Sequence, residues 1–247
     1  MPRKFWVERH EDEYKRKLTT ARLKREIRII GRYINKKHCE IIDVPCGYGR
    51  ISNVLAAKGY AVTGVDKNAD FLRKARTDAK RAAIKGQVRY VHRDFLNFHP
   101  RQGYDLVLNI YSSLGYYESE AKNRQMLKSL FRLANPEGKI IIELFNPYRI
   151  LENNSHNSSF KNKKGQKITY TRTYDLLTSV NITQIDKWRR QRHISNRVYC
   201  IRMYFPHELA EMALHYDCKL IDVLNTNGNT KDLIRSRRLW LIFKKYA

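Results

Sequence analysis

The stretch over residues 39–49, Cys-Glu-Ile-Ile-Asp-Val-Pro-Cys-Gly-Tyr-Gly, constrains the fold of this 247-residue chain more than any other. Residues 40–44 form a short, largely apolar run that predicts a buried parallel strand. Gly47 and Gly49 then end the strand, and residues 50–58 predict a helix. The glycines let the backbone approach a ligand closely, and the free N–H groups of the first helical turn face it. We therefore expect a ligand-binding turn here.

Beyond this turn, predicted strands alternate with predicted helices as far as residue 145. The strands cover residues 40–44, 61–65, 88–92, 104–109 and 139–145, and the helices cover 50–58, 69–83 and 118–134. Such alternation with short loops predicts an α/β fold with a doubly wound parallel sheet. Asp43, Asp66, Asp94 and Asn109 stand at the carboxyl ends of four strands, which is where such sheets bind their ligands.

The alternation breaks over residues 147–204. Residues 153–164 are polar and predict an irregular segment, and three antiparallel strands are predicted at 167–174, 180–185 and 197–204. A helix at 206–216 and a strand pair at 219–225 and 239–244 follow. Because these closing elements come after the break, we interpret about 147–204 as a small inserted sheet within a single domain, 39–247.

In these residues the chain resembles the class I S-adenosylmethionine-dependent methyltransferases. The matching stretches are residues 43–49, 62–66, 93–95, 104–109, 112–117 and 133–138, so the resemblance covers about residues 39–146. It implies the class I methyltransferase fold, a seven-stranded, mostly parallel sheet, in which the broken alternation over 147–204 forms an antiparallel β insertion after strand 5. It also implies S-adenosyl-L-methionine as the cofactor. Glu137 departs from the family pattern, which has a second glycine there; this affects a loop and not the cofactor pocket.

The resemblance further implies which residues contact the cofactor. These are Asp43, Gly47, Gly49, Asp66, Lys67, Asp94, Phe95 and Asn109. The two glycines would face the methionine part, Asp66 would bind the ribose hydroxyls, and Asp94 with Phe95 would hold the adenine. A nicotinamide oxidoreductase with the same turn is the competing interpretation, which Ser52 and the separate Asp94 disfavour. A non-enzymatic RNA-binding protein that retains the pocket is a third.

Residues 1–38 predict a basic amphipathic segment, with a helix over about 12–34. Its apolar positions at helical spacing are Tyr14, Leu18, Ala21, Ile27, Ile30 and Ile34. The opposite face is basic and includes Arg22, and we expect these charges to be solvated. The helix is also a candidate to close over the cofactor, which would bring Trp6 and Tyr14 to the acceptor site.

The chain carries 49 basic and 24 acidic residues, a formal charge of +25. Residues 1–38 and 151–206 are each net +8, and both lie outside the cofactor module. Because a basic surface favours polyanions by counterion release, we expect RNA, ribosomal or transfer RNA, as partner and methyl acceptor. The predicted phosphate-binding residues are Lys161, Lys163, Lys164, Arg189, Arg190 and Arg192. The alternative is a small-molecule N- or O-methyltransferase whose insertion forms a lid.

The sequence does not identify a catalytic residue. A sulfonium methyl group is already activated, so transfer requires an acceptor held in line in a site that excludes water. A general base is needed only if the acceptor must lose a proton. Tyr111 and Tyr116 follow the fourth strand, and we take them as candidates to contact the acceptor or to stack on a base. That they are core residues is an equal alternative.

Other classes of protein are disfavoured by composition. The four cysteines form no Cys-x-x-Cys pair, so we expect no metal site and no disulfide scaffold. The charged beginning of the chain does not resemble a signal peptide, and no run approaches the ~20 apolar residues that span a bilayer. We expect a cytoplasmic protein without membrane contact. The atom that is methylated and the oligomeric state stay open.

Overall fold

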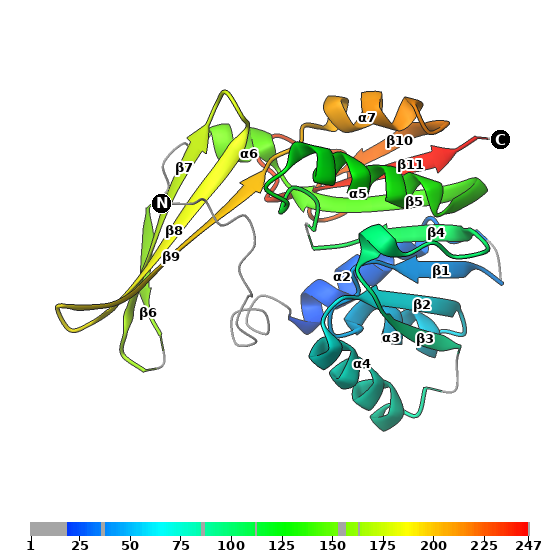
Figure 1. Ribbon diagram of the computed structural model, residues 1–247, viewed down its shortest axis with the longest axis horizontal. Coiled ribbons are helices and arrows are strands. Elements are labelled where there is room, and N and C mark those ends of the chain that lie inside the picture. Colours follow the sequence, from blue (N-terminus) through cyan, green and yellow to red (C-terminus); the bar gives the residue numbers. More distant parts are fainter. Residues whose placement is uncertain are drawn as a thin grey trace.

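Seven strands form one sheet at the centre of the computed structural model, which describes residues 19–35, 38–84, 87–111, 113–152, 157–162 and 164–246 (Figure 1). The strand order is β10-β11-β5-β4-β1-β2-β3. The strands are β1 (Glu40–Asp43), β2 (Ala61–Asp66), β3 (Val88–His92), β4 (Tyr104–Asn109), β5 (Ala134–Phe145), β10 (Cys218–Leu224) and β11 (Arg238–Lys245). β1 to β5 pair in parallel, and β11 is antiparallel to both neighbours. The predicted fold class, with β1 near the centre, is confirmed.

Both faces of this sheet are buried, because helices cover each of them. Adjacent residues of a strand point to opposite faces. Ile42 accordingly packs with α5 (Glu120–Arg132) and α7 (Pro206–Leu214), while its neighbour Ile41 packs with α2 (Thr20–Gly31) and α3 (Arg50–Ala57). The remaining helices are α4 (Ala69–Arg81), the short 3₁₀ helix η1 (Phe95–Asn97) and α6 (Pro147–Glu152). This explains why the central strands are apolar throughout and do not alternate.

Side-chain caps fix where three of the helices begin. Thr19, Asn68 and Ser119 each accept a hydrogen bond from a backbone N–H of the first turn, at the starts of α2, α4 and α5. The helix predicted over 12–34 is observed as α2, which ends at Gly31; residues 12–18 lie outside the described residues. None of the described helices combines the length and apolar character that crossing a membrane requires.

A second, four-stranded antiparallel sheet follows α6 and extends away from the main sheet (Figure 1). Its strands, in the order β6-β7-β8-β9, are β6 (Ser158–Lys161), β7 (Lys167–Asp175), β8 (Val180–Arg189) and β9 (Arg192–Arg202). The predicted antiparallel insertion is therefore confirmed, but β6 lies in the stretch predicted to be irregular. Phe160 explains this strand, since its ring stacks on Tyr170 of β7 at a centroid distance of 6.0 Å. The helix α6 was not predicted either.

The fifth strand begins earlier than predicted. β5 starts at Ala134, which pairs with Tyr104, whereas the sequence predicted a strand from residue 139 and a helix as far as 134. Glu137 has φ +64°, a left-handed conformation that glycine adopts without a steric penalty. This is the position at which the chain departs from the family pattern, so the strain of that departure is visible in the backbone. Lys244 forms an ion pair with Glu137 across the strands at 2.5 Å.

Candidate active site

The glycine turn after β1 packs closely against its protein neighbours. Gly47 and Gly49 have φ +55° and +68°, and Gly49 is the N-cap of α3. A Cβ atom on Gly49 would lie 2.2 Å from the hydroxyl of Tyr90 and 2.8 Å from the Cβ of Ala75. Neither contact is sterically possible, and the left-handed φ adds strain for any other residue. Gly49 is thus required where β3 and α4 pack on the turn.

Asp66 holds the turn to the end of β2. One of its carboxylate oxygens accepts a hydrogen bond from the Gly47 N–H, and the other accepts one from the Asn68 N–H, each at 2.8 Å. Burial raises the pKa of this carboxyl, and the two backbone hydrogen bonds act in the opposite direction. An ionised carboxylate has about four acceptor positions, so each oxygen can still accept a hydroxyl. The carboxylate is therefore fixed in place and able to bind a diol.

Asp43, at the end of β1, is buried and accepts a hydrogen bond from the Ser52 hydroxyl at 2.6 Å. Burial raises its pKa to about 6, although the Ser52 hydrogen bond and the charge of Arg50 favour the ionised form. Ser52 is the residue that departs from the dinucleotide pattern, and the structure gives it a role on the protein side. It is fully buried and bonded to Asp43.

We expect Asp43→Asn to remove a pH dependence of stability. The folded pKa of about 6 lies above the ordinary aspartate value of 3.8, so the stabilisation from proton uptake is full below pH 3.8 and is lost as the pH rises through 6. This contribution is about 3 kcal/mol, from roughly 2 pH units at 1.4 kcal/mol each. Urea unfolding from pH 4 to 7 should show the variant gaining stability relative to the parent by this amount. Parallel curves for the two proteins would contradict the assignment.

Asn109, at the end of β4, presents a buried acceptor beside the same turn. Its side chain is inaccessible to solvent, and its Nδ2 donates to the carbonyl of Val44 at 2.7 Å. Its Oδ1 has no hydrogen-bond partner among the described residues. Because a buried amide oxygen without a donor is costly, this atom fits a ligand that brings an N–H group to the carboxyl ends of β1 and β4.

The remaining predicted cofactor residues lie near the ends of β2 and β3. Asp94 accepts a hydrogen bond from the Leu96 N–H at 3.0 Å and so caps η1. Phe95 is buried in the core cluster that contains α5. The Lys67 side chain is exposed, and the carbonyl of this residue lies 3.0 Å from Nε2 of His92. The acidic groups of Asp43, Asp66 and Asp94 thus lie at one edge of the sheet, as predicted from strand order.

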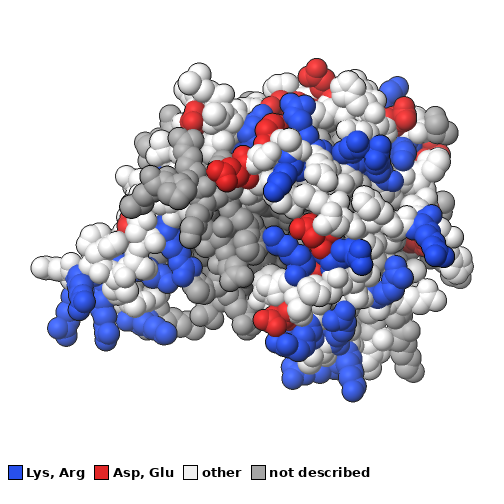
Figure 2. All heavy atoms as spheres, viewed as in Figure 1, with Lys and Arg blue, Asp and Glu red and all other residues white. Residues whose placement is uncertain are grey.

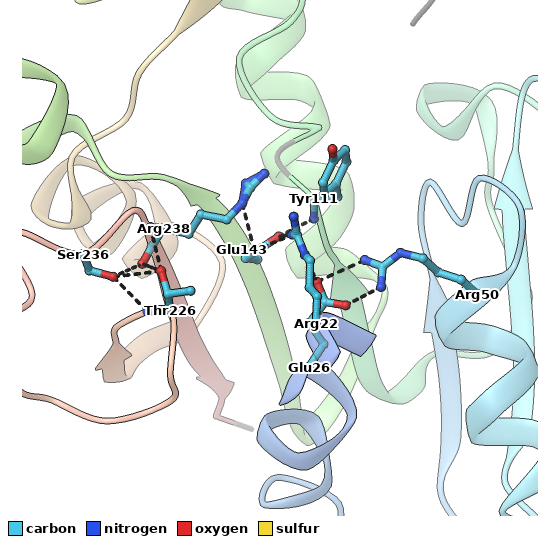
Figure 3. A network of polar contacts seen from close by, with 8 residues as sticks. All are labelled: Arg22, Glu26, Arg50, Tyr111, Glu143, Thr226, Ser236 and Arg238. Atoms are coloured by element: carbon cyan, nitrogen blue, oxygen red, sulfur yellow. Dashed lines mark hydrogen bonds and ion pairs between the residues drawn. The ribbon is translucent and has the colours of Figure 1, made fainter. Parts of the chain in front are cut away.

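A network of buried charges joins α2 to the carboxyl edge of the sheet (Figure 3). Glu143 of β5 accepts a hydrogen bond from Arg22 and forms an ion pair with Arg238 of β11, each at 3.0 Å. The side chains of Glu143 and Arg238 are both buried. Arg22 also contacts Glu26 at 2.7 Å, and Glu26 in turn pairs with Arg50 at the start of α3. Burial lowers the pKa of Arg238, while Glu143 acts in the opposite direction. The network therefore connects α2, α3, β5 and β11.

The same network positions Tyr111. The Tyr111 N–H donates to Glu143 at 2.7 Å, and its backbone has φ +80°. The guanidinium groups of Arg22 and Arg238 lie 4.6 and 5.0 Å from the centre of its ring. The prediction that Arg22 is solvated is wrong, because this side chain reaches inward to two carboxylates. Tyr111 is held at the end of β4, where a wall of the acceptor site was predicted.

The other acceptor candidates are distributed differently. Tyr116 is half-buried and packs against the cluster of Tyr174, Ile201 and Met203 at the base of the second sheet. Burial raises the pKa of the neighbouring Tyr117 to about 12, and the charge of Asp94 adds to this. Trp6 and Tyr14 lie outside the described residues.

Three predicted substrate residues, Arg189, Arg190 and Arg192, are exposed at the far end of the β8–β9 hairpin. The inner end of this hairpin contacts the segment after β4, since the Arg202 N–H donates to the carbonyl of Gly115 at 2.8 Å. Arg192 and Arg202 stand ten positions apart along β9, a span of roughly 30 Å for an extended strand. The structure therefore does not bring these arginines together with Tyr111.

Sequence reasoning missed the carboxylates and the buried arginine of the network. Glu143 follows Ile140-Ile-Ile142 inside an apolar strand, and Arg238 precedes the apolar run over residues 239–243. A charged residue within such a run signals either a strand boundary or a buried ion pair. Arg22 and Glu26 stand four residues apart, a spacing that favours an ion pair on one helix face.

Comparison with known protein families identifies a match over residues 35–194 to a family described as a methyltransferase domain. Among curated proteins, a putative methyltransferase, YqeM of Bacillus subtilis (strain 168), is 29% identical over 113 residues, 45% of this chain and 44% of that protein. A ubiquinone biosynthesis O-methyltransferase of Rickettsia felis is 30% identical over 119 residues, 48% of this chain and 46% of that protein. The chain spans about half the length of the curated relatives it matches.

Solved structures match over nearly the whole chain. An S-adenosylmethionine-dependent methyltransferase from Clostridium acetobutylicum has a TM-score of 0.73 at 13% identity, covering 95% of both chains. The amino pentose methyltransferase CalS10 from Micromonospora echinaspora, solved with S-adenosylmethionine bound, has a TM-score of 0.70 at 14% identity, covering 97% of this chain and 98% of CalS10. At these identities the matches establish the fold.

Proposed function

From the premise that this chain belongs to the S-adenosylmethionine-dependent methyltransferases, whose domain it matches over residues 35–194, we propose that its methyl acceptor is a small molecule. The curated relatives include ubiquinone biosynthesis O-methyltransferases, and the structural neighbours include an amino pentose methyltransferase and a sugar N-methyltransferase. The observation that carries the proposal is that the likeness to CalS10 extends over 97% of the chain, and so takes in the second sheet as well as the cofactor module.

The cofactor assignments are part of this proposal. The turn at Gly47–Gly49, the carboxylate of Asp66 and the buried Oδ1 of Asn109 offer close backbone approach, a diol acceptor and an ammonium acceptor at one edge of the sheet. When bound, S-adenosylmethionine supplies an activated methyl group on its sulfonium. The chain's own task is to hold the acceptor in line and to exclude water.

Tyr111 is the residue we assign to the acceptor wall. Its ring is flanked by two guanidinium groups and its N–H is fixed by Glu143, so the side chain is held rigidly at the end of β4. A rigid wall beside the transferred methyl group is what positioning requires, because small displacements of the acceptor carry large rate penalties. Tyr116 connects this wall to the second sheet through its packing on Ile201 and Met203.

RNA is not retained as the methyl acceptor. The ubiquinone biosynthesis, amino pentose and sugar methyltransferases named above act on small acceptors by name, whereas the expectation of RNA rested on the basic charge of residues 1–38 and 151–206 and on their placement beside the acceptor site. In addition, Arg189, Arg190 and Arg192 lie at the outer end of the second sheet, away from Tyr111.

The test is transfer of a tritiated methyl group from S-adenosylmethionine into three fractions of a cell extract. We expect label in the low-molecular-weight metabolite fraction and background in total RNA and in ribosomal subunits. An Asp66→Ala variant, impaired in cofactor binding, serves as the control for contaminating activities and should lose the label. Labelling confined to RNA would refute the proposal, and mass spectrometry of the labelled metabolite would identify the acceptor.

A further inference from the structure

The outer end of the four-stranded sheet is strongly basic. We define the basic tip as the seven side chains Lys161, Lys164, Lys167, Lys187, Arg189, Arg190 and Arg192, of which all but the half-buried Lys187 are exposed. In Figure 2, blue Lys and Arg spheres gather at the lower left, over this end of the sheet. No carboxylate in the described part of the chain forms an ion pair with any of the seven.

Strand register places several of these cations directly opposite one another. Lys161 of β6 pairs with Lys167 of β7, and Arg189 of β8 pairs with Arg192 of β9. Neighbouring strands lie about 4.8 Å apart, and like charges in directly opposed positions destabilise a sheet. The isolated fold would therefore gain stability from neutral residues at either pair. A bound polyanion would offset the repulsion at both.

The one described carboxylate near the basic tip does not relieve this repulsion. Asp186 accepts hydrogen bonds from Gln184 at 2.8 Å and from Asn196 at 2.7 Å, and it lies 2.9 Å from Nε2 of His193. Its acceptor positions are directed at neutral amides and an imidazole, all on β8 and β9. The cations of the basic tip thus face solvent.

An aromatic side chain shares a face of the sheet with two of the cations, Lys161 and Lys167. Trp188 of β8 pairs with Lys167 on one side and with His193 on the other, so these three residues share a face of the sheet. Trp188 is half-buried, and its ring lies 4.7 Å from that of His193. Cations that neutralise phosphates beside an aromatic platform are the combination with which proteins bind single-stranded nucleic acid.

We propose that the basic tip is a docking surface for single-stranded nucleic acid, separate from the methyl-acceptor site. The lysines and arginines hold phosphates and Trp188 stacks on a base. The separation follows from the strand length, because Arg192 lies roughly 30 Å along β9 from the contact between Arg202 and Gly115 at the active-site edge. A nucleotide held at the tip does not reach Tyr111, so binding there is compatible with a small methyl acceptor.

Fluorescence anisotropy with a labelled single-stranded RNA of about 20 nucleotides tests the proposal. We expect binding that weakens steeply between about 50 and 300 mM salt. Replacing Arg189, Arg190 and Arg192 together by alanine should weaken binding about tenfold or more and make the slope of log K against log salt shallower by about 2, since each single-strand phosphate contact contributes roughly 0.7.

A matched control removes three exposed cations elsewhere, namely Lys58 directly after α3 and Lys80 and Arg81 at the end of α4, and should leave the slope unchanged. Trp188→Ala should weaken binding roughly tenfold, while Trp188→Phe, which keeps a stacking ring, should retain most of it. Unchanged affinity for S-adenosylmethionine in every variant shows that each is folded. Equal weakening in the control triple variant, or binding to phosphatidylglycerol vesicles without binding to RNA, would overturn the proposal.

Discussion

Replacing Glu143 by alanine should lower the free energy of unfolding by about 3–5 kcal/mol, because it leaves a buried charge on Arg238 without its partner. The substitution also removes the acceptor for the Tyr111 N–H and for Arg22. For a chain of this size we expect a decrease in Tm of roughly 6–20 °C. Thermal and urea unfolding followed by circular dichroism would measure both quantities.

Glu137→Ala is the matched control, since it removes a glutamate from the same strand. Glu137 is largely exposed and pairs with Lys244 at the surface, so its removal should change the midpoints of thermal and urea unfolding little. Glu143→Gln keeps an acceptor for the Tyr111 N–H but removes the charge, so the loss of unfolding free energy in this variant should lie between those of the two alanine variants. If Glu143→Ala were no more destabilising than Glu137→Ala, the buried network would not be a structural requirement.

Asp66→Ala should weaken the binding of S-adenosylmethionine by about 1–3 kcal/mol, roughly 5- to 150-fold. The carboxylate is assigned to the ribose hydroxyls, and it also orders the glycine turn through its hydrogen bonds to the N–H groups of Gly47 and Asn68. Both effects act on the same ligand, so this substitution should be the most damaging in the cofactor site. Isothermal titration calorimetry gives the affinity directly.

The control for Asp66 is Asp70→Ala, four residues along the chain. Asp70 is exposed in the first turn of α4 and contacts Arg73 at the surface. Its removal takes away the same charge without touching the turn, and cofactor affinity should stay unchanged. Equal affinities for the parent and the Asp66 variant would show that the ribose is held elsewhere.

The main sheet was predictable because its signals are local. Each central strand is a short apolar run, and α3 and α4 begin at a glycine turn and a side-chain cap, as Gly49 and Asn68 show. Strand order then follows from alternation, since parallel neighbours joined by helices admit few arrangements. The same reasoning placed Asp43, Asp66 and Asn109 at one edge, because carboxyl ends of parallel strands coincide.

The charged network was not predictable because its members are far apart in sequence. Arg22 and Glu143 are 121 positions apart in the sequence, and the residues around each of them do not indicate which residue it pairs with. The sequence predicts a solvated Arg22 because this residue stands on the polar face of an amphipathic helix. That face packs on the sheet edge here, and tertiary contact overrides the local pattern.

The strand β6 was not predictable for a different reason. A single aromatic residue, Phe160, in a polar segment is too weak a pattern to predict a strand.

The pairing of β5 with β11 has a consequence for synthesis on the ribosome. Phe145 pairs with Arg238, so β5 leaves the ribosome 93 residues before its antiparallel neighbour begins to do so. During that interval Ile140, Ile141 and Ile142 present an open, apolar strand edge, and such edges favour aggregation. The second sheet, whose hairpins pair close neighbours in sequence, can form meanwhile. The nascent chain is thus most vulnerable between the emergence of β5 and that of β11.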